Sequence, residues 1–335
     1  MGHRRRYTGP VSEVTDRLAI VVVTYNRAEL LSELLVSISR LARAPWRIVV
    51  VDNASTDSTP DVLTTAARLF AADQLVVHRT DTNTGGSGGF STGVDVALAE
   101  GAQWMWLMDD DVEVLPDALD NFAPWMERFT CLHGRRYDVN GTPFYWQAKF
   151  NQFLGVPLPY SVRTFSSQGY AVTNSGTFEG MLIHADVVAR IGLPDPRFFI
   201  SWDDAVYGWL ASQYTQVAYV DTFVLRKKRQ QKQISLVIRH LNDSSALVKY
   251  HVMRNRGYVW RYFRTYGKLH PIGFGIGTAL TFGKEILRLV AVEHSGKGFG
   301  ELLHGLRDAT TLRHDPAWRP MPPLDAAPAG PAPSA

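Results

Sequence analysis

Three consecutive carboxylates, Asp109, Asp110 and Asp111, follow the apolar run 104–108. Such a run predicts a buried strand, and its acidic end would then lie at the edge of a sheet. Adjacent carboxylates repel one another, so a cation would stabilise this strand end. In an extended chain Asp109 and Asp111 point to the same side, which suits one hard divalent cation and leaves coordination positions for phosphate oxygens. A solvated acidic turn before a helix near Leu115 is the alternative interpretation.

A second acidic pair, Asp203 and Asp204, follows Trp202. A carboxylate beside an aromatic side chain suits a general base that removes the proton of an incoming hydroxyl. Trp202 and Trp209 could stack on a sugar face. Alternatively, Asp203 caps a helix that begins at Ala205. We expect one aspartate to be structural and the other catalytic.

Two histidines, His240 and His251, are placed late enough in the chain to return to the acidic residues. A neutral imidazole is a plausible third metal ligand beside two carboxylates. A plain surface or core position is the alternative for each. The basic side chains of Arg254 and Arg256 offer donors for a diphosphate.

Four apolar runs alternate with helical patterns in the first third of the chain. This alternation predicts a doubly wound α/β fold, in which ligands bind outside the carboxyl ends of the strands. Polar residues fall at all four strand ends, which indicates one shared site. The strands are expected at 18–23, 48–51, 75–78 and 104–108, and the helices near 31–38, 60–69 and 90–98.

A glycine-rich segment, residues 83–89, follows the third strand. Its spacing departs from GxGxxG and it does not follow the first strand, which excludes a Rossmann oxidoreductase. Glycines before a helix let backbone N–H groups approach an anion, although a tight turn is the alternative. Asp52 could accept the N–H edge of a nucleobase, whereas Asp52 and Asn53 could also simply cap a turn.

Composition restricts the class of protein further. The 335 residues carry a net charge of +3, too small to indicate nucleic acid. The single cysteine, Cys131, excludes an internal disulfide framework and favours a reducing compartment. The basic N-terminus lacks an apolar stretch, so no secretory signal is expected. A basic segment is either a solvated face or a contact for an anionic membrane or substrate; it contains Arg226, Lys227, Lys228, Arg229, Lys232 and Arg239.

We expect four regions along the chain. Residues 1–17 form an extension, and residues 18–265 form the α/β domain. Residues 266–315 form a helical region that could associate with a membrane. Residues 316–335 are rich in Pro and Ala and are expected to be disordered.

With these residues assembled, the chain resembles an inverting family 2 glycosyltransferase of the GT-A fold. The segments 23–27, 51–57 and 109–111 are similar to the nucleotide and metal elements of that family. Within it, the chain is most similar to bacterial galactofuranosyltransferases, and related rhamnosyltransferases share much of the pattern. That likeness spans residues 18–265 and includes the segments 83–90, 108–111, 199–208 and 250–256.

The resemblance implies a role for each site residue. Asp204 would be the general base. Mn2+ or Mg2+ would be bound by Asp109, Asp111 and His240. The acceptor and sugar would be contacted by Trp202, Asp203, Glu179 and Gly180. The donor nucleotide would be contacted by Thr24, Tyr25, Arg27, Asp52, Asn53, Asn83, Gly85, Gly86, Asp110 and His251, with Asp52 at the uracil and His251 at the diphosphate.

The implied function is metal-dependent, inverting transfer of galactofuranose from UDP-galactofuranose to a hydroxyl of a lipid-linked or cell-envelope glycan. A rhamnosyl- or other hexosyltransferase that uses a dTDP- or UDP-sugar is the alternative enzyme. A catalytically silent glycan- or nucleotide-binding protein is the alternative outside enzymes. No nucleic-acid partner is expected. The expected location is cytoplasmic, with peripheral docking on the inner face of the cell membrane.

Overall fold

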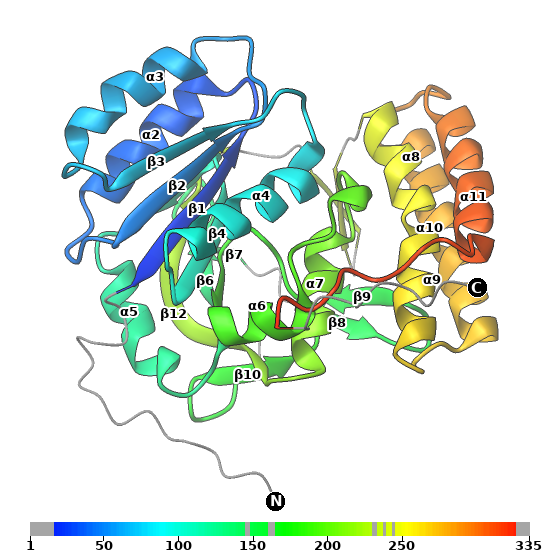
Figure 1. The fold of residues 1–335 in the computed structure, drawn as a ribbon. Helices are drawn as coiled ribbons and strands as arrows, with labels where there is room; N and C mark the ends of the chain where they lie inside the picture. The colour runs from blue at the N-terminus through cyan, green and yellow to red at the C-terminus, as the bar shows by residue number, and fades with distance from the viewer. Residues whose placement is uncertain are drawn as a thin grey trace, which may run out of the picture.

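The computed structural model describes residues 17–144, 148–159, 165–229, 233–236, 239–242 and 245–325, with only the backbone for 233–236 and 239–242. A large mixed sheet with helices on both faces forms one side of the molecule (Figure 1). The helices near the C-terminus form a second group beside it (Figure 1). The predicted α/β class is confirmed.

The N-terminal half of the sheet is parallel, in the order β4-β1-β2-β3. Its strands are β1 (Leu18–Thr24), β2 (Arg47–Asp52), β3 (Leu75–Arg79) and β4 (Trp104–Asp109). The register pairs Thr24 with Asp52 and Val23 with Asp109. The polar residues that follow these strands therefore lie together at the carboxyl ends of the strands, as the sequence predicted.

The other half of the sheet mixes directions. β11 (Met181–His184) is antiparallel to both β4 and β6 (Cys131–Tyr137). β12 (Val217–Lys227) runs parallel to β6, and β10 (Tyr170–Thr173) completes the edge. Two short strands pair with the ends of β12 and β6: β5 (Val112–Val114) and β7 (Pro143–Phe144). A short strand, β5, therefore follows the three aspartates, and the helix expected near Leu115 begins at Ala118.

Alternate residues of β1 pack into two separate cores, because successive side chains of a strand point to opposite faces. Ile20 and Val22 face one core, and Val21 and Val23 face the other. The first core is covered by α2 (Ala28–Ser39), α3 (Thr59–Ala66) and α5 (Ala118–Met126). The second is covered by α4 (Gly85–Ala99), α6 (Ala185–Ile191) and α7 (Asp203–Ser212).

Short elements complete the α/β part. A hairpin of β8 (Ala148–Asn151) and β9 (Val156–Pro159) stands apart from the main sheet, as does the pair β13 (Gln233–Leu236) and β14 (Arg239–Asn242). Two single turns of 3-10 helix are η1 (Ala67–Leu69) and η2 (Pro196–Phe198).

Four helices form the C-terminal group: α8 (Ala246–Arg254), α9 (Arg256–Thr265), α10 (Pro271–Ala291) and α11 (Phe299–His314). A break at Asn255 separates α8 from α9. Helices α8 and α9, which lie before residue 266, pack with α11. Within the ranges given above, no helix combines the length and apolar character needed to cross a membrane.

The chain returns to α6 after α11 (Figure 1). Trp318 is buried edge-on against Tyr262, and the Leu324 N–H donates to the Ala189 carbonyl at 2.7 Å. Disorder was expected from residue 316, whereas residues 316–325 lie packed against the domain. Residues 1–16 and 326–335 lie outside the described part of the chain.

Candidate active site

Asp110 is buried where β4 ends and the chain turns. Its two oxygens accept hydrogen bonds from the Thr24 hydroxyl at 2.7 Å and from Arg27 Nη1 at 2.9 Å. Since Asp110 and Asp111 lie in a turn, the simple alternation expected for an extended strand does not apply to them. Asp110 therefore holds Thr24 and Arg27 in place.

Asp109 lies close to three other carboxyl groups. Burial raises the pKa of Asp109 well above its usual range, and repulsion from Asp111, Glu179 and Asp110 raises it further, against the attraction of Arg27. Arg27 Nη1 lies 3.6 Å from an Asp111 oxygen. No hydrogen bond from a described residue reaches the Asp109 carboxylate.

Two neighbouring carboxylates with surplus negative charge fit a hard divalent cation, for which carboxylate oxygens are preferred ligands. Within the described ranges, no group of three or more His, Cys, Asp or Glu residues is arranged to hold a metal ion. Asp109 and Asp111 would thus supply part of a coordination shell, and phosphate oxygens or water would supply the rest.

The two candidate histidines differ in position. His240 lies in β14 opposite Ser235, and its side chain is outside the described part of the structure. His251 is buried on α8, stacked on Phe199 with ring centroids 5.0 Å apart. Burial and the nearby Arg254 lower the pKa of His251 to about 4. His251 is therefore neutral at pH 7, and would contact a diphosphate as a neutral donor.

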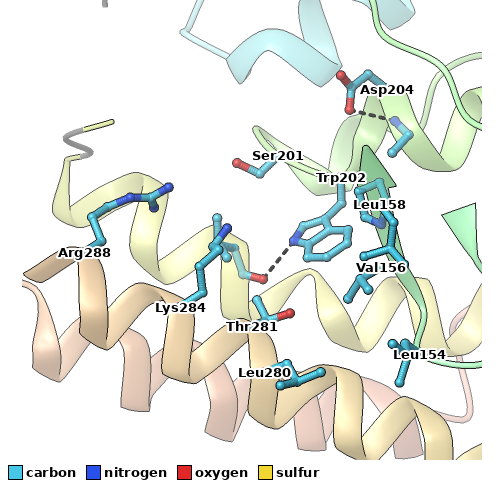
Figure 2. Close-up of a pocket in the computed structure, with 13 residues that line it drawn as sticks. Leu154, Val156, Leu158, Ser201, Trp202, Asp204, Leu280, Thr281, Lys284 and Arg288 are labelled. Atoms are coloured by element: carbon cyan, nitrogen blue, oxygen red, sulfur yellow. Dashed lines mark hydrogen bonds between the residues drawn. The ribbon is translucent and has the colours of Figure 1, made fainter. Parts of the chain in front are cut away.

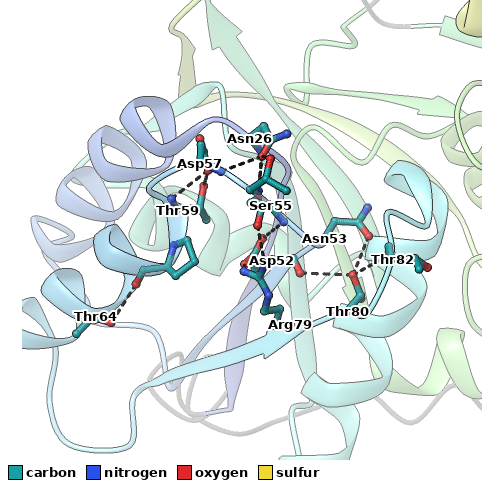
Figure 3. Close-up of polar contacts among 12 residues, drawn as sticks. Asn26, Asp52, Asn53, Ser55, Asp57, Thr59, Thr64, Arg79, Thr80 and Thr82 are labelled. Atoms are coloured by element: carbon teal, nitrogen blue, oxygen red, sulfur yellow. Dashed lines mark hydrogen bonds and ion pairs between the residues drawn. The ribbon is translucent and has the colours of Figure 1, made fainter.

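Asp52 organises the loop that follows β2. Its Oδ1 accepts the Ser55 N–H at 2.9 Å, and its Oδ2 forms an ion pair with Arg79 (Figure 3). Arg79 also donates to the Ser55 carbonyl at 2.6 Å. Asp52 is buried, and both of its oxygens already have partners within the chain.

Asn53 organises the glycine-rich segment. Its Oδ1 accepts the Thr84 N–H at 2.9 Å, and its Nδ2 donates to the Gly85 carbonyl at 2.9 Å. The Asn83 side-chain oxygen accepts the Gly85 N–H at 2.8 Å. These amide contacts start α4 at Gly85, five residues before the predicted start at Phe90.

The two glycines predicted at the donor site have different structural requirements. Gly85 has φ +74°, and a Cβ there would overlap the carbonyl oxygen of Phe199. Gly86 has open space around its Cα. Gly85 therefore permits close approach of the glycine-rich segment to the loop before Asp203, while Gly86 borders free space that a ligand could fill.

The accessible groups at these strand ends include Tyr25, which is 42% exposed, and the half-exposed side chains of Arg27 and Arg79. An aromatic ring can stack on a base, and guanidinium groups bind phosphate. Sequence reasoning missed Arg79. The signal for it was a basic residue at the carboxyl end of a predicted strand.

The loop 199–202 brings the second acidic pair into position. Phe199, Ser201 and Trp202 all have left-handed backbone conformations, with φ of 65°, 70° and 72°. Asn255, buried between α8 and α9, donates through Nδ2 to the carbonyls of Phe198, Ile200 and Ser201 at 2.8–2.9 Å. Backbone strain of this kind persists only where surrounding contacts hold it. Asn255 is a second residue whose role the sequence did not reveal.

Asp203 and Asp204 make different contacts. Asp203 accepts the Ser87 hydroxyl at 2.7 Å, which ties α7 to α4. Asp204 accepts the N–H of Ala205 at 2.6 Å. Surrounding protein raises the pKa of Asp204 to about 7, with a further contribution from repulsion by Asp203. This pKa suits proton transfer near neutrality.

The two candidate tryptophans, Trp202 and Trp209, also differ in their surroundings. The Trp202 indole donates to the Val252 carbonyl at 2.9 Å and lines a cavity (Figure 2). Trp209 is fully buried against Phe263, so the expectation that it stacks on a sugar is wrong.

The segment 177–180 connects the two acidic sites. The Thr177 hydroxyl accepts the Glu179 N–H at 3.3 Å and also favours the charged form of Asp204. Glu179 is close enough to Asp109 to raise its pKa, and it forms an ion pair with Arg136. The Gly180 N–H donates to the Leu107 carbonyl of β4 at 2.8 Å. Strand β4 and helix α7 thus present their carboxylates to one region.

A cavity of about 450 Å³ lies beside Asp204 (Figure 2). It is bounded by the β8–β9 hairpin, the loop before α7, and helices α8 and α10. Apolar side chains form most of its wall, and two cationic side chains lie at one end. The lining includes Leu154, Val156, Leu158, Trp202, Leu280, Lys284 and Arg288.

Residues 19–185 match the family model "Glycosyl transferase family 2". Galactofuranosyltransferase GlfT1 of Mycobacterium tuberculosis H37Rv is 30% identical over 202 residues, covering 57% of this chain and 63% of that protein. The GlfT1 of Mycolicibacterium smegmatis is 31% identical over the same length, with the same coverage. The chain thus spans less than two thirds of the GlfT1 proteins it matches.

Solved structures show the same fold at lower identity. Staphylococcus aureus TarS 1–349 in complex with UDP-GlcNAc aligns with a TM-score of 0.55 at 15% identity, over 88% of this chain and 81% of that one. GalNAc-T7 with UDP, GalNAc and Mn2+ aligns with a TM-score of 0.52 at 16% identity, over 63% and 43%. Both neighbours are GT-A glycosyltransferases. The chain therefore carries a glycosyltransferase family 2 domain, and the predicted family and GT-A fold are confirmed.

Proposed function

We propose that this protein is a metal-dependent inverting glycosyltransferase that transfers galactofuranose from UDP-galactofuranose to a hydroxyl of a lipid-linked or cell-envelope glycan. One observation carries the proposal: Asp204, with its pKa raised to about 7, borders a cavity and connects through segment 177–180 to the carboxylates that end β4. The similarity to GlfT1 favours galactofuranose as the sugar.

The donor would lie at the carboxyl ends of the parallel strands. Tyr25 offers a ring to the base, while Arg27 and Arg79 offer charge to the diphosphate. Asp109 and Asp111 would hold Mn2+ or Mg2+, with His240 as the proposed further ligand. A bound divalent cation would offset the charge that develops on the departing diphosphate.

The acceptor would occupy the cavity beside Asp204. Asp204 takes the proton of the acceptor hydroxyl, whose oxygen bonds to the anomeric carbon as the bond from that carbon to the nucleotide diphosphate breaks. One in-line displacement inverts the anomeric centre and requires no covalent enzyme intermediate. Trp202, Asp203, Glu179 and Gly180 shape this end of the site.

A panel of UDP- and dTDP-sugars, assayed for release of nucleotide diphosphate in the presence of glycan acceptors, tests the reaction. UDP-galactofuranose is expected to be the best donor. Turnover with dTDP-rhamnose or another hexose donor in its place would support the alternative transferase. Donor binding without any turnover would support a silent binding protein.

The Asp204→Asn variant tests the general base. We expect a loss of about 10²–10⁴-fold in turnover, with UDP binding unchanged by calorimetry. Asp186→Asn is the matched control, because the Asp186 side chain is 87% exposed at the start of α6. Equal turnover in Asp204→Asn and the control would remove Asp204 from the mechanism.

The metal is tested by UDP calorimetry with and without Mn2+. We expect tighter binding with Mn2+, and loss of that gain in Asp109→Asn, because the variant removes one of the two carboxylates proposed to hold the metal. Binding that does not respond to Mn2+ in the unsubstituted protein would contradict a metal held by Asp109 and Asp111.

We also propose that the protein works on the cytoplasmic side of the cell membrane. The basic segment is a weak candidate for the membrane contact. Arg226 pairs with Glu113 at 3.2 Å, and Lys228 pairs with Glu33 at 2.8 Å. Lys227 is buried over the ring of Phe144. These three side chains are engaged within the domain, while Lys232 and the side chain of Arg239 lie outside the described part of the structure.

A further inference from the structure

Helix α10 presents an entirely apolar face to solvent. Each of its exposed residues between 271 and 290 is an apolar residue or a glycine. Ile272 is 81% exposed and Val290 is 67% exposed. The exposed set is Pro271, Ile272, Gly275, Ile276, Ala279, Leu280, Gly283, Leu287 and Val290.

This face is long and continuous. At 1.5 Å per residue, the helix extends about 27 Å between Ile272 and Val290. The opposite face is buried, with Phe274 and Leu289 in apolar cores and Glu285 in ion pairs with neighbouring cations. Large exposed apolar patches on soluble domains mark interaction sites.

The charged residues near α10 indicate which kind of partner its exposed face would bind. Residues 244–284 contain no Asp or Glu. Exposed Lys268 and His270 precede the helix, and exposed His294 and Lys297 follow it. An apolar face bordered by basic residues matches an interfacial helix on an anionic lipid surface. A second copy of the chain would bring two sets of these basic side chains together, which disfavours self-association through this face.

The same helix borders the cavity beside Asp204. Leu280 belongs both to the exposed face and to the cavity wall, and Lys284 lines the cavity one turn further on (Figure 2). The apolar surface therefore runs from the outside of α10 to the opening next to the acidic site.

We propose that the exposed face of α10 lies on an anionic lipid leaflet and turns the Asp204 cavity toward it. An acceptor with a lipid anchor would then reach Asp204 without leaving the membrane. This consequence for the acceptor rests on the proposed function, whereas the contact between α10 and lipid does not.

Co-sedimentation of the full chain with vesicles tests the surface. We expect binding to vesicles of phosphatidylcholine with about one third phosphatidylglycerol, and weaker binding at high salt because exposed charges are screened. The double variant Ile272→Glu/Val290→Glu should bind at least tenfold more weakly. Leu69→Glu is the matched control, since Leu69 is 46% exposed on η1, far along the chain from the helical group.

Folding and activity separate this proposal from the proposed function. The double variant should keep the unfolding midpoint and the turnover of a water-soluble glycoside acceptor, and should lose activity only on a vesicle-embedded acceptor. Vesicle binding without any transferase activity would support the contact between α10 and lipid but overturn the proposed function. Equal vesicle binding by the double variant, or a dimer that the double variant abolishes, would overturn the lipid contact.

Discussion

Asn255 has no predicted role in chemistry, yet its side chain holds the loop that carries the acidic pair. Its amide nitrogen donates to three carbonyls of residues 198–201. Phe199, Ser201 and Trp202 lie in left-handed conformations within or next to that segment. We therefore expect Asn255→Ala to release the loop and displace Asp204.

The two amide hydrogens of Asn255 are shared among the three acceptors. At a net value of about 0.5–1.5 kcal/mol per hydrogen bond, their loss corresponds to about 1–3 kcal/mol. Each left-handed residue in turn stores about 1–3 kcal/mol of strain, which the loop would release by relaxing. Relaxation limits the loss of stability but moves Asp204, so kcat should fall by tenfold or more.

Denaturant unfolding and steady-state kinetics on the same samples measure both effects. Donor KM should change as well, because Phe199 of this loop closely approaches Gly85 and stacks on His251 at the proposed donor side. Asn121→Ala is the matched control: it removes one amide contact, to the Phe223 carbonyl at 3.2 Å, away from the site. A folded Asn255→Ala protein with the kcat of the control would refute the positioning role.

Two further predictions concern the pH dependence and the glycine-rich segment. Because Asp204 must be ionised to act as base, kcat/KM should rise through about pH 7. The pKa of Asp204 is higher in the folded than in the unfolded chain, so its contribution to stability should be lost as the pH rises from about 4 to 7. The unfolding midpoint should therefore fall less over this pH range in Asp204→Asn than in the unsubstituted protein. An equal fall in both proteins would contradict the raised pKa of Asp204. Gly85→Ala should destabilise the fold by more than about 1–2 kcal/mol in denaturant unfolding, because of its positive φ and the overlap with Phe199. Gly86→Ala, in open space, should leave stability nearly unchanged, and equal effects of the two would contradict the close approach at Gly85.

The amino-acid sequence determined the α/β fold and the edge at which the site lies. Strands of a parallel sheet covered on both faces are apolar throughout, so the runs 18–23 and 104–108 were readable without neighbours. Because parallel strands end together, the polar residues after them could be assigned to one place. The pairing of Asp109 with Val23 and of Asp52 with Thr24 follows from that rule.

Only the tertiary structure decided what each polar side chain does there. Asp110 accepts hydrogen bonds from Thr24 and Arg27, and Asp52 pairs with Arg79. These partners come from distant parts of the chain. Asn255 reaches a loop more than fifty residues earlier in the chain.

The sequence predicted a helical region at 266–315 that could associate with a membrane, but it did not determine which side of α10 is exposed. Apolar residues at helical spacing predict a buried stripe, and which side of a helix meets its neighbours depends on how the helices pack. In this fold one apolar side is buried and the other is left open beside the cavity of Asp204. The local pattern of apolar residues determines the helices and strands, while the partners of a side chain depend on contacts between distant parts of the chain.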